Sequence, residues 1–121
     1  MKYIIKHRFI SLNQYIAKER SNRYVAAKIK KDETNIAYYS LKGKEKIAIP
    51  SKLRFIWHVK DKRTDLDNIA FGKKFILDGF VKAGLIVDDS LKYIYGFVDE
   101  IVIDKMEYVE IETIEGEQNG I

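Results

Sequence analysis

The stretch from Ser51 to Lys60 reads SKLRFIWHVK, and its alternation of apolar and polar side chains predicts the strand that organises the chain. Leu53, Phe55, Trp57 and Val59 lie on one face, and Lys52, Arg54, His58 and Lys60 lie on the other. A helix is predicted next, over residues 68–83, because apolar residues recur there three and four positions apart. Gly84 is expected to end that helix, and Gly72 and Gly79 on its apolar face allow another backbone to approach closely.

The flanking sequence completes a mixed pattern of strands and helices. We expect a first strand over residues 3–10, a basic helix from about Leu12 towards Lys31, a further helical piece over 33–42, and strands over 93–104 and 106–114. The strand over 93–104 is apolar on both faces, which is typical of a central strand. The sequence thus predicts one α+β (mixed α/β) domain over residues 1–121, with about four strands packed by helices and a frayed tail at 115–121.

Composition and charge narrow the class of protein. The chain has no cysteine, so thiolate chemistry is excluded and a reducing, cytoplasmic location is expected. No apolar stretch approaches the length needed to cross a membrane. One of the 22 basic and eight of the 18 acidic side chains fall in residues 99–121, which leaves 21 basic and 10 acidic side chains in residues 1–98. Such a basic body suits a polyanion such as DNA, and a lysine-rich surface balanced by an acidic end is the alternative.

Two acidic pairs flank the predicted helix. Asp65-Leu66-Asp67-Asn68 precedes it, and Asp88-Asp89 follows it. Asp65 and Asp67 are two residues apart, so in an extended segment their carboxylates point to the same side. With the second pair they can supply three or four hard oxygen ligands to Mg²⁺ or Mn²⁺. A helix about 24 Å long separates the two pairs, and the sequence leaves open whether they meet.

Structural roles are the alternative for these acids and for the histidines. Asp65 or Asp67 can simply cap the helix, and Asp88-Asp89-Ser90 can simply form a turn. His7 and His58 lie on predicted strands far apart in the sequence, so both are expected to be structural. The sequence contains no glycine-rich phosphate loop and no His-Glu-x-x-His motif.

The ordered motif resembles a known family of nucleases. Asp65-Leu66-Asp67-Asn68, then Lys74 and Asp78, then Lys82-Ala83-Gly84 through Asp88-Asp89-Ser90 together resemble the RusA-type Holliday junction resolvases common in bacterial prophages. The resemblance covers about residues 61–95 closely. It implies a homodimeric, bacterial or phage-encoded endonuclease of the nucleoid that cuts four-way DNA junctions in recombination and repair. It further implies Mg²⁺ or Mn²⁺ as cofactor and no small-molecule cofactor or membrane partner.

The resemblance also assigns roles to individual residues. Asp65, Asp67 and Asp89 correspond to the catalytic, metal-binding aspartates, with Asp88 as an additional ligand. Lys74 corresponds to the catalytic lysine because it keeps the four-residue spacing to Asp78. In the family this lysine follows the second aspartate by one helical turn, whereas Lys74 follows Asp67 by seven residues, so Lys73 remains an alternative.

Candidate DNA contacts come from the basic segments. The basic helix is expected to begin with a capping box formed by Ser11 and Gln14. The candidate residues are Asn13, which the resemblance places near DNA, together with Arg20, Arg23, Lys28, Arg63 and Lys73. A solvated helix face is the alternative for the helical ones. Two other functions stay open, namely a non-catalytic DNA-binding protein of this fold and a flap or branch nuclease without junction specificity.

Overall fold

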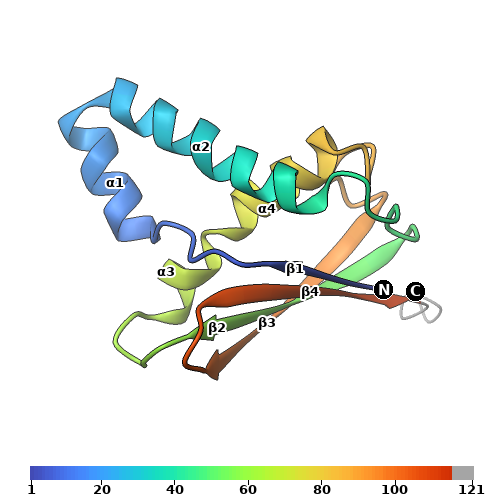
Figure 1. The fold of residues 1–121 in the computed structure, drawn as a ribbon. Coiled ribbons are helices and arrows are strands. Elements are labelled where there is room, and N and C mark those ends of the chain that lie inside the picture. Colours follow the sequence, from blue (N-terminus) through green and yellow to red (C-terminus); the bar gives the residue numbers. More distant parts are fainter. Residues whose placement is uncertain (116–121) are drawn as a thin grey trace.

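The computed structural model describes residues 1–115 as a four-stranded mixed sheet with helices packed on one face (Figure 1). The strands are β1 (Lys2–Ile5), β2 (Ser51–Val59), β3 (Ile94–Ile103) and β4 (Tyr108–Glu115). The helices are α1 (Leu12–Ser21), α2 (Arg23–Leu41), α3 (Leu66–Ala70) and α4 (Lys73–Lys82). The predicted α+β class with about four strands is confirmed. The tail expected at 115–121 lies outside the described residues, except that Glu115 is the last residue of β4.

The strand order β1-β4-β2-β3 determines where each loop lies. β4 is antiparallel to both β1 and β2, whereas β2 and β3 run parallel, with Ser51 opposite Ile94 and Val59 opposite Ile103. Parallel neighbours need a crossover connection, and α3 and α4 provide it across the sheet (Figure 1). The segment after β2 therefore lies at one end of the sheet, and the segment before β3 lies at the other.

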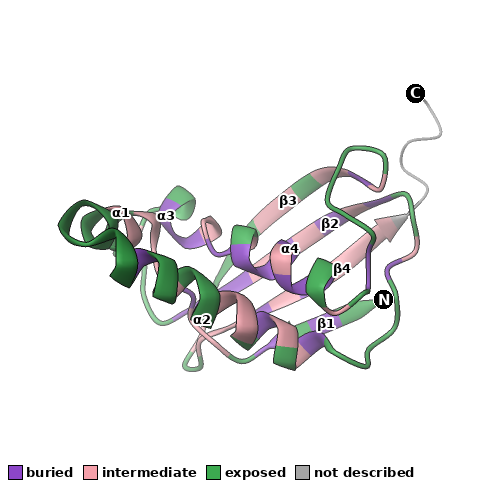
Figure 2. Ribbon diagram, turned by 90° about the horizontal axis from the view of Figure 1, so that it is seen from above, coloured by how far each residue is buried: buried purple, intermediate pink, exposed green. Residues whose placement is uncertain are grey.

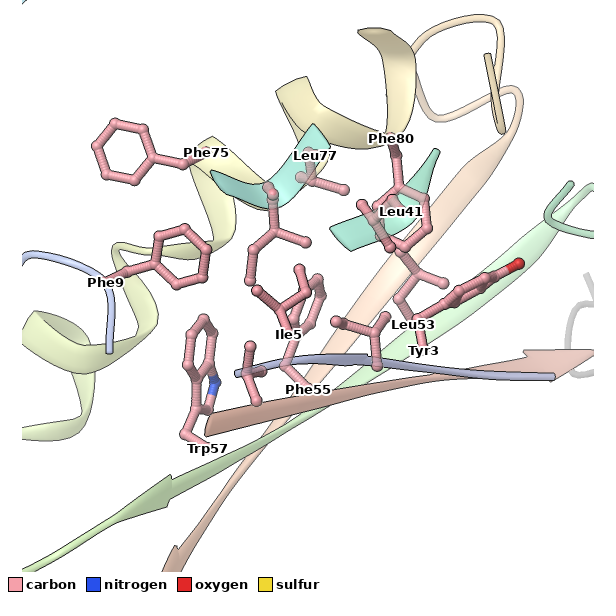
Figure 3. Close-up of a cluster of buried hydrophobic side chains, with 14 of the residues drawn as sticks. Tyr3, Ile5, Phe9, Leu41, Leu53, Phe55, Trp57, Phe75, Leu77 and Phe80 are labelled. Atoms are coloured by element: carbon pink, nitrogen blue, oxygen red, sulfur yellow. The ribbon is translucent and has the colours of Figure 1, made fainter. Parts of the chain in front are cut away.

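The apolar face of β2 forms the centre of the core, as the alternation predicted. Leu53 and Phe55 are fully buried, and Trp57 is 4% exposed. Figure 3 shows them beneath Phe75, Leu77 and Phe80 of α4, with Tyr3 and Ile5 of β1 beside them. Because burying one such side chain contributes roughly 1.5–3 kcal/mol, this shared face of strand and helix stabilises the domain.

Glycines allow α4 to pack closely against its neighbours, as expected from the sequence. A Cβ atom on Gly79 would lie 2.6 Å from Cβ of Ala37 in α2, and one on Gly72 would lie 2.7 Å from Cβ of Phe9. Both distances are too short for ordinary contacts, so only glycine fits. Gly84 has a φ of +75° just after α4, which confirms the predicted glycine end of that helix.

Two helix boundaries differ from the prediction. The break in the basic helical region is at Asn22, not near residue 32, because Asn22 is extended and its side chain caps α2 by accepting from the backbone N–H of Tyr24 at 2.9 Å. The helix expected over 68–83 is two helices, interrupted at Phe71 and Gly72. Its apolar periodicity continues across the break because Phe71 still faces the apolar interior, where it contacts Tyr15.

Two strand predictions are corrected as well. The first strand ends at Ile5 rather than residue 10, because only residues 2–5 pair with β4 and Phe9 then enters the core. The prediction that the strand over 93–104 is central is wrong for the single chain, since β3 is at the edge of the sheet. Its Phe97 and Ile103 side chains are 44% and 46% exposed. Apolar side chains on both faces of a strand favour a position where both faces are covered, but they do not identify what covers them.

The close contact between α2 and α4 yields a stability prediction. Gly79→Ala should destabilise the protein by about 1–3 kcal/mol through overpacking, although alanine is the better helix former by about 1 kcal/mol. The Ala37→Gly variant removes the atom that the new methyl group would meet. In urea unfolding, the double variant should therefore be less destabilised than the sum of the single variants. Strictly additive effects would contradict the proposed contact.

Candidate metal and nucleic-acid site

Asp65 and Asp67 lie in the turn between β2 and α3, and both side chains are exposed. Asp65 occupies the N-cap position in an extended conformation, with φ −64° and ψ 153°, but its side chain makes no capping hydrogen bond. Asp67 is the acidic residue of the first turn of α3. The Asp65 carboxylate is thus at the cap position without performing the capping role, which leaves its oxygens directed to solvent and available to a ligand.

Asn68 fixes this turn to the start of α1. Its side chain is buried, and its Oδ1 accepts a hydrogen bond from the backbone N–H of Asn13 at 2.8 Å. The predicted capping box is present two residues earlier, since Ser11 Oγ accepts from the backbone N–H of Gln14 at 3.2 Å and the Gln14 side chain accepts from the Ser11 backbone. The acidic turn and the first turn of α1 are therefore held together.

A pocket of about 300 Å³ lies where these two segments meet. Its lining residues are Arg8, Ser11, Asn13, Gln14, Arg63, Thr64, Asp65 and Asn68. Two of the expected DNA contacts, Asn13 and Arg63, thus share one pocket with Asp65. Guanidinium groups beside a carboxylate are suited to a phosphate that is bridged to the carboxylate by a cation.

Arg8 is the pocket residue that the sequence did not single out. It donates hydrogen bonds to Glu107 and, at 3.4 Å, to Thr64 Oγ1. Its position was predicted as part of a strand, but residues 6–10 leave the sheet and turn Arg8 towards the loop after β2.

The two candidate lysines have different surroundings. Lys73 Nζ lies 2.6 Å from Asp99 Oδ2 of β3, and the same carboxylate accepts from Trp57 Nε1 at 2.9 Å. Lys73 also lies over the Phe97 ring, 4.6 Å from its centroid. These contacts tie Lys73 into the fold, whereas Lys74 is exposed. The structural surroundings favour Lys74 over Lys73 as the lysine that faces a ligand.

Asp88 and Asp89 lie in the exposed loop before β3, at the opposite end of the sheet from Asp65 and Asp67 (Figure 1). The eight-residue rise from Ser51 to Val59 alone separates the two ends by about 26 Å. Asp88 Oδ1 accepts from the backbone N–H of Ser90 at 2.8 Å, so this segment forms the turn that was the structural alternative. Hydrogen bonds from Ser90 hold the pKa of the Asp88 carboxyl below its ordinary value.

The donor set of one chain does not fit the expected metal site. Within residues 1–115, no group of three or more aspartate, glutamate or histidine side chains is arranged to hold an ion. Asp65 and Asp67 provide two carboxylates, and Asn68 Oδ1 already accepts from Asn13. Because Mg²⁺ ligands must lie about 2.0–2.1 Å from the ion, Asp88 and Asp89 of the same chain are too far away to complete the site.

α1 and the first half of α2 form a basic arm that projects beyond the sheet (Figure 1), whereas Ala37 and Leu41 in the second half of α2 are buried in the core. α1 has no buried residue, and Figure 2 shows the turn between the two helices as exposed. Arg20 and Arg23 lie beside this turn, and Lys28 pairs with Asp32 at 2.8 Å along α2. Arg20, Arg23 and Lys28 are therefore surface residues of one arm. DNA binding and a solvated helix face both require this exposure.

The acidic residues near the C-terminal end pair with basic residues of the sheet. Glu110 Oε2 lies 2.9 Å from Lys2 Nζ, and Glu110 Oε1 lies 2.7 Å from Nε2 of the buried His58. Asp104 Oδ2 lies 3.1 Å from His58 Nδ1. The hydrogen bond from Lys2 is the main reason that the pKa of Glu110 is lowered. His58 thus has a structural environment between two carboxylates, and His7 likewise pairs with Glu33 at 2.6 Å.

Comparisons with protein-family models and with curated protein sequences find no match for this chain. Among residues 1–115, every helix is too short or too polar to cross a membrane. The fold, the pocket and the charge distribution are therefore the observations from which a function is inferred.

The interaction between Asn13 and Asn68 can be tested by unfolding. Asn68→Ala should cost about 0.5–1.5 kcal/mol, because it removes the acceptor of the part-buried hydrogen bond from the backbone N–H of Asn13. Asn13→Ala is the matched control, since it keeps the backbone donor, and it should change the free energy of unfolding much less. Equal losses in urea unfolding would show that the side chain of Asn13, rather than its backbone, carries the contact.

The lowered pKa of Glu110 predicts a pH dependence of stability. A lowered folded-state pKa contributes stability that is present above the ordinary value of 4.5 and is lost as the pH falls below it. Glu110→Gln should therefore be less stable than wild type at pH 7, and the difference should shrink towards pH 3. Urea unfolding across this range measures the difference. Glu19→Gln, at an exposed position of α1, is the control and should change stability little.

Proposed function

We propose that this protein is a metal-dependent endodeoxyribonuclease that resolves Holliday junctions or related branched DNA in recombination and repair. The observation that carries the proposal is the pocket at the end of β2, where Asp65 lies with Arg8, Arg63 and the Asn13–Asn68 pair. The oxygens of a phosphodiester are negatively charged, so two arginines can donate hydrogen bonds to them. A carboxylate can approach the same oxygens only when a cation lies between them. The pocket has both kinds of group.

The remaining residues have roles in the same proposal. Asp65, Asp67 and Asp89 are the catalytic and metal-binding residues, with Asp88 as a further ligand, and Mg²⁺ or Mn²⁺ is the cofactor. A divalent ion at phosphate supplies charge that stabilises the transition state, and the exposed Lys74 of α4 is assigned the role of a further positive charge. Because the carboxylates of one chain are at opposite ends of the sheet, the active unit is a homodimer.

Arg20, Arg23 and Lys28 give the proposal its DNA-binding surface. They lie on the arm formed by α1 and α2, whose first turn is hydrogen-bonded to Asn68. Duplex DNA carries a negative charge about every 1.7 Å of its axis, so a basic arm that starts at the pocket can follow a DNA branch away from the cut site. This arrangement suits branched DNA in the cytoplasm or nucleoid better than a small phosphorylated molecule.

A specific observation favours a second candidate, a non-catalytic DNA-binding protein of the same fold. The single chain lacks a cluster of three acidic or histidine side chains among residues 1–115, and Asp88 has a structural role in its turn. In this alternative the arm and the arginine pocket bind DNA, and the acids shape the loops without holding an ion.

Cleavage of a synthetic four-way junction with Mg²⁺ separates the candidates. Wild type should yield nicked duplexes, and Asp67→Asn should lower the rate at least about 100-fold because it removes a charged ligand. Glu45→Gln, in the loop before β2, removes an acid elsewhere and should retain the wild-type rate. Wild type that binds the junction but never cuts it supports the non-catalytic protein. Equal cleavage of flaps would replace junction specificity with general branch cleavage.

A further inference from the structure

We propose that Tyr24, at the tip of the basic arm, stacks on an unpaired or splayed base of DNA and thereby makes the arm prefer branched or single-stranded DNA to continuous duplex. Tyr24 is the second residue of α2, directly after the turn that joins α1 to α2. Its side chain is 73% exposed, more than any other aromatic side chain among residues 1–115. The inference rests on the DNA binding of the proposed function and does not depend on the cleavage step.

The tip of the arm is a corner closed by its own hydrogen bonds. Asn22 Oδ1 accepts from the backbone N–H of Tyr24 at 2.9 Å and from that of Val25 at 3.3 Å. The Lys18 carbonyl accepts from the backbone N–H of Asn22 at 2.8 Å and from Ser21 Oγ at 3.0 Å. The backbone that carries Tyr24 is therefore fixed at the surface. A contact made from a fixed position costs less ordering on binding than one made from a flexible loop.

The surroundings of the Tyr24 ring leave it available to a ligand. Its one ring interaction within residues 1–115 is with the neighbouring Arg23, whose Cζ lies 5.3 Å from the ring centroid and whose Nη2 lies 3.5 Å from the hydroxyl. Arg23 is itself exposed. A tyrosine ring and a guanidinium plane side by side are two groups on which a nucleic-acid base can stack.

The charge around the tip indicates which partner the tyrosine meets. Residues 12–31 carry six basic side chains and one acidic side chain. Lysine is depleted at protein interfaces, so these lysine-rich surroundings disfavour a protein partner. Tyr24 and Val25 are the only large apolar side chains exposed in this segment, which is too small an apolar face for a helix that lies in a membrane surface. DNA offers both an anionic backbone for the bases of the arm and a flat apolar surface for the ring.

Stacking requires a base whose face is open. In continuous duplex the neighbouring bases cover each face, whereas single strands, loops and branches expose bases that an aromatic side chain can reach. α1 has ten residues, so the tip lies about 15 Å from the first turn of α1. That distance is about four to five phosphate spacings of one duplex strand. The arm therefore places the stacked base a few nucleotides from the phosphate in the pocket at Asp65.

DNA binding by tyrosine variants tests the inference, with EDTA present so that no strand is cut. Tyr24→Ala should weaken binding to a four-way junction and to single-stranded DNA by about tenfold, within the range for loss of one base–aromatic stack. Binding to a blunt duplex of the same length should change by less than about twofold, because the variant removes no charge. Tyr24→Phe keeps the ring and should bind like wild type.

Tyr39→Ala is the matched control on the same helix. Tyr39 is 66% exposed, but it lies towards the other end of α2, where its ring contacts Tyr38 and lies beneath Lys42. Its substitution should leave binding to every DNA unchanged. Urea unfolding should show that Tyr24→Ala and Tyr39→Ala are as stable as wild type, since both positions are exposed.

Tryptophan fluorescence of Tyr24→Trp reports on the tip directly. Trp57 is 4% exposed, so wild type gives the background signal. The added indole should be quenched by single-stranded DNA and by the junction, and much less by duplex. Vesicles that contain phosphatidylserine should leave its emission unchanged. A blue shift with these vesicles and no quenching with DNA would assign the tip to a membrane surface and overturn the inference.

The inference and the nuclease function fail in different ways. If Tyr24→Ala weakens binding to junction and duplex equally, or to neither, base stacking by Tyr24 is wrong, and cleavage by wild type still stands. If wild type binds the junction without ever cutting it, and Tyr24→Ala selectively weakens that binding, the nuclease function is wrong and the stacking role is supported.

Discussion

The parallel pairing of β2 with β3 is the constraint on which the rest of the structure depends. Parallel neighbours cannot be joined by a tight turn, so the chain crosses the sheet through α3 and α4 before β3 begins. That crossover supplies Phe75 and Phe80 to the core above β2. It also carries the second acidic pair to the far end of the sheet. The crossover therefore explains both the packing of the domain and the separation of its two acidic pairs to opposite ends of the sheet.

The distribution of charge follows from the sheet in the same way. Acids of β3 and β4 pair with bases of α4 and of the neighbouring strands, as Asp99 does with Lys73 and Glu110 with Lys2 and His58. These interactions neutralise the acidic end of the chain within the fold. The basic residues of the arm remain at the surface. The arm is therefore more strongly basic than the overall charge of +4 indicates.

Features that depend on neighbouring residues in the sequence could be predicted. The relative placement of residues that are far apart in the sequence could not. The alternation around Phe55, the capping box at Ser11 and the glycine end at Gly84 depend on neighbours in sequence, and each was predicted. The close packing of Gly72 against Phe9 joins residues far apart in the sequence, and the edge position of β3 depends on where β4 pairs. In the candidate site, Asp65 and Asn68 were identified from the motif. Arg8 was missed because a distant loop places it in the pocket.

The hydrogen bond between Asn13 and Asn68 connects the basic arm to the acidic turn. α1 has no fully buried residue, and at the base of the arm its partly buried Tyr15 packs on Phe71 and Phe75 at the edge of the core. Its first turn is attached to the acidic loop through the Asn13 backbone. The base of the arm is therefore joined directly to the turn that carries Asp65 and Asp67, so the position of the arm and the position of these carboxylates depend on each other.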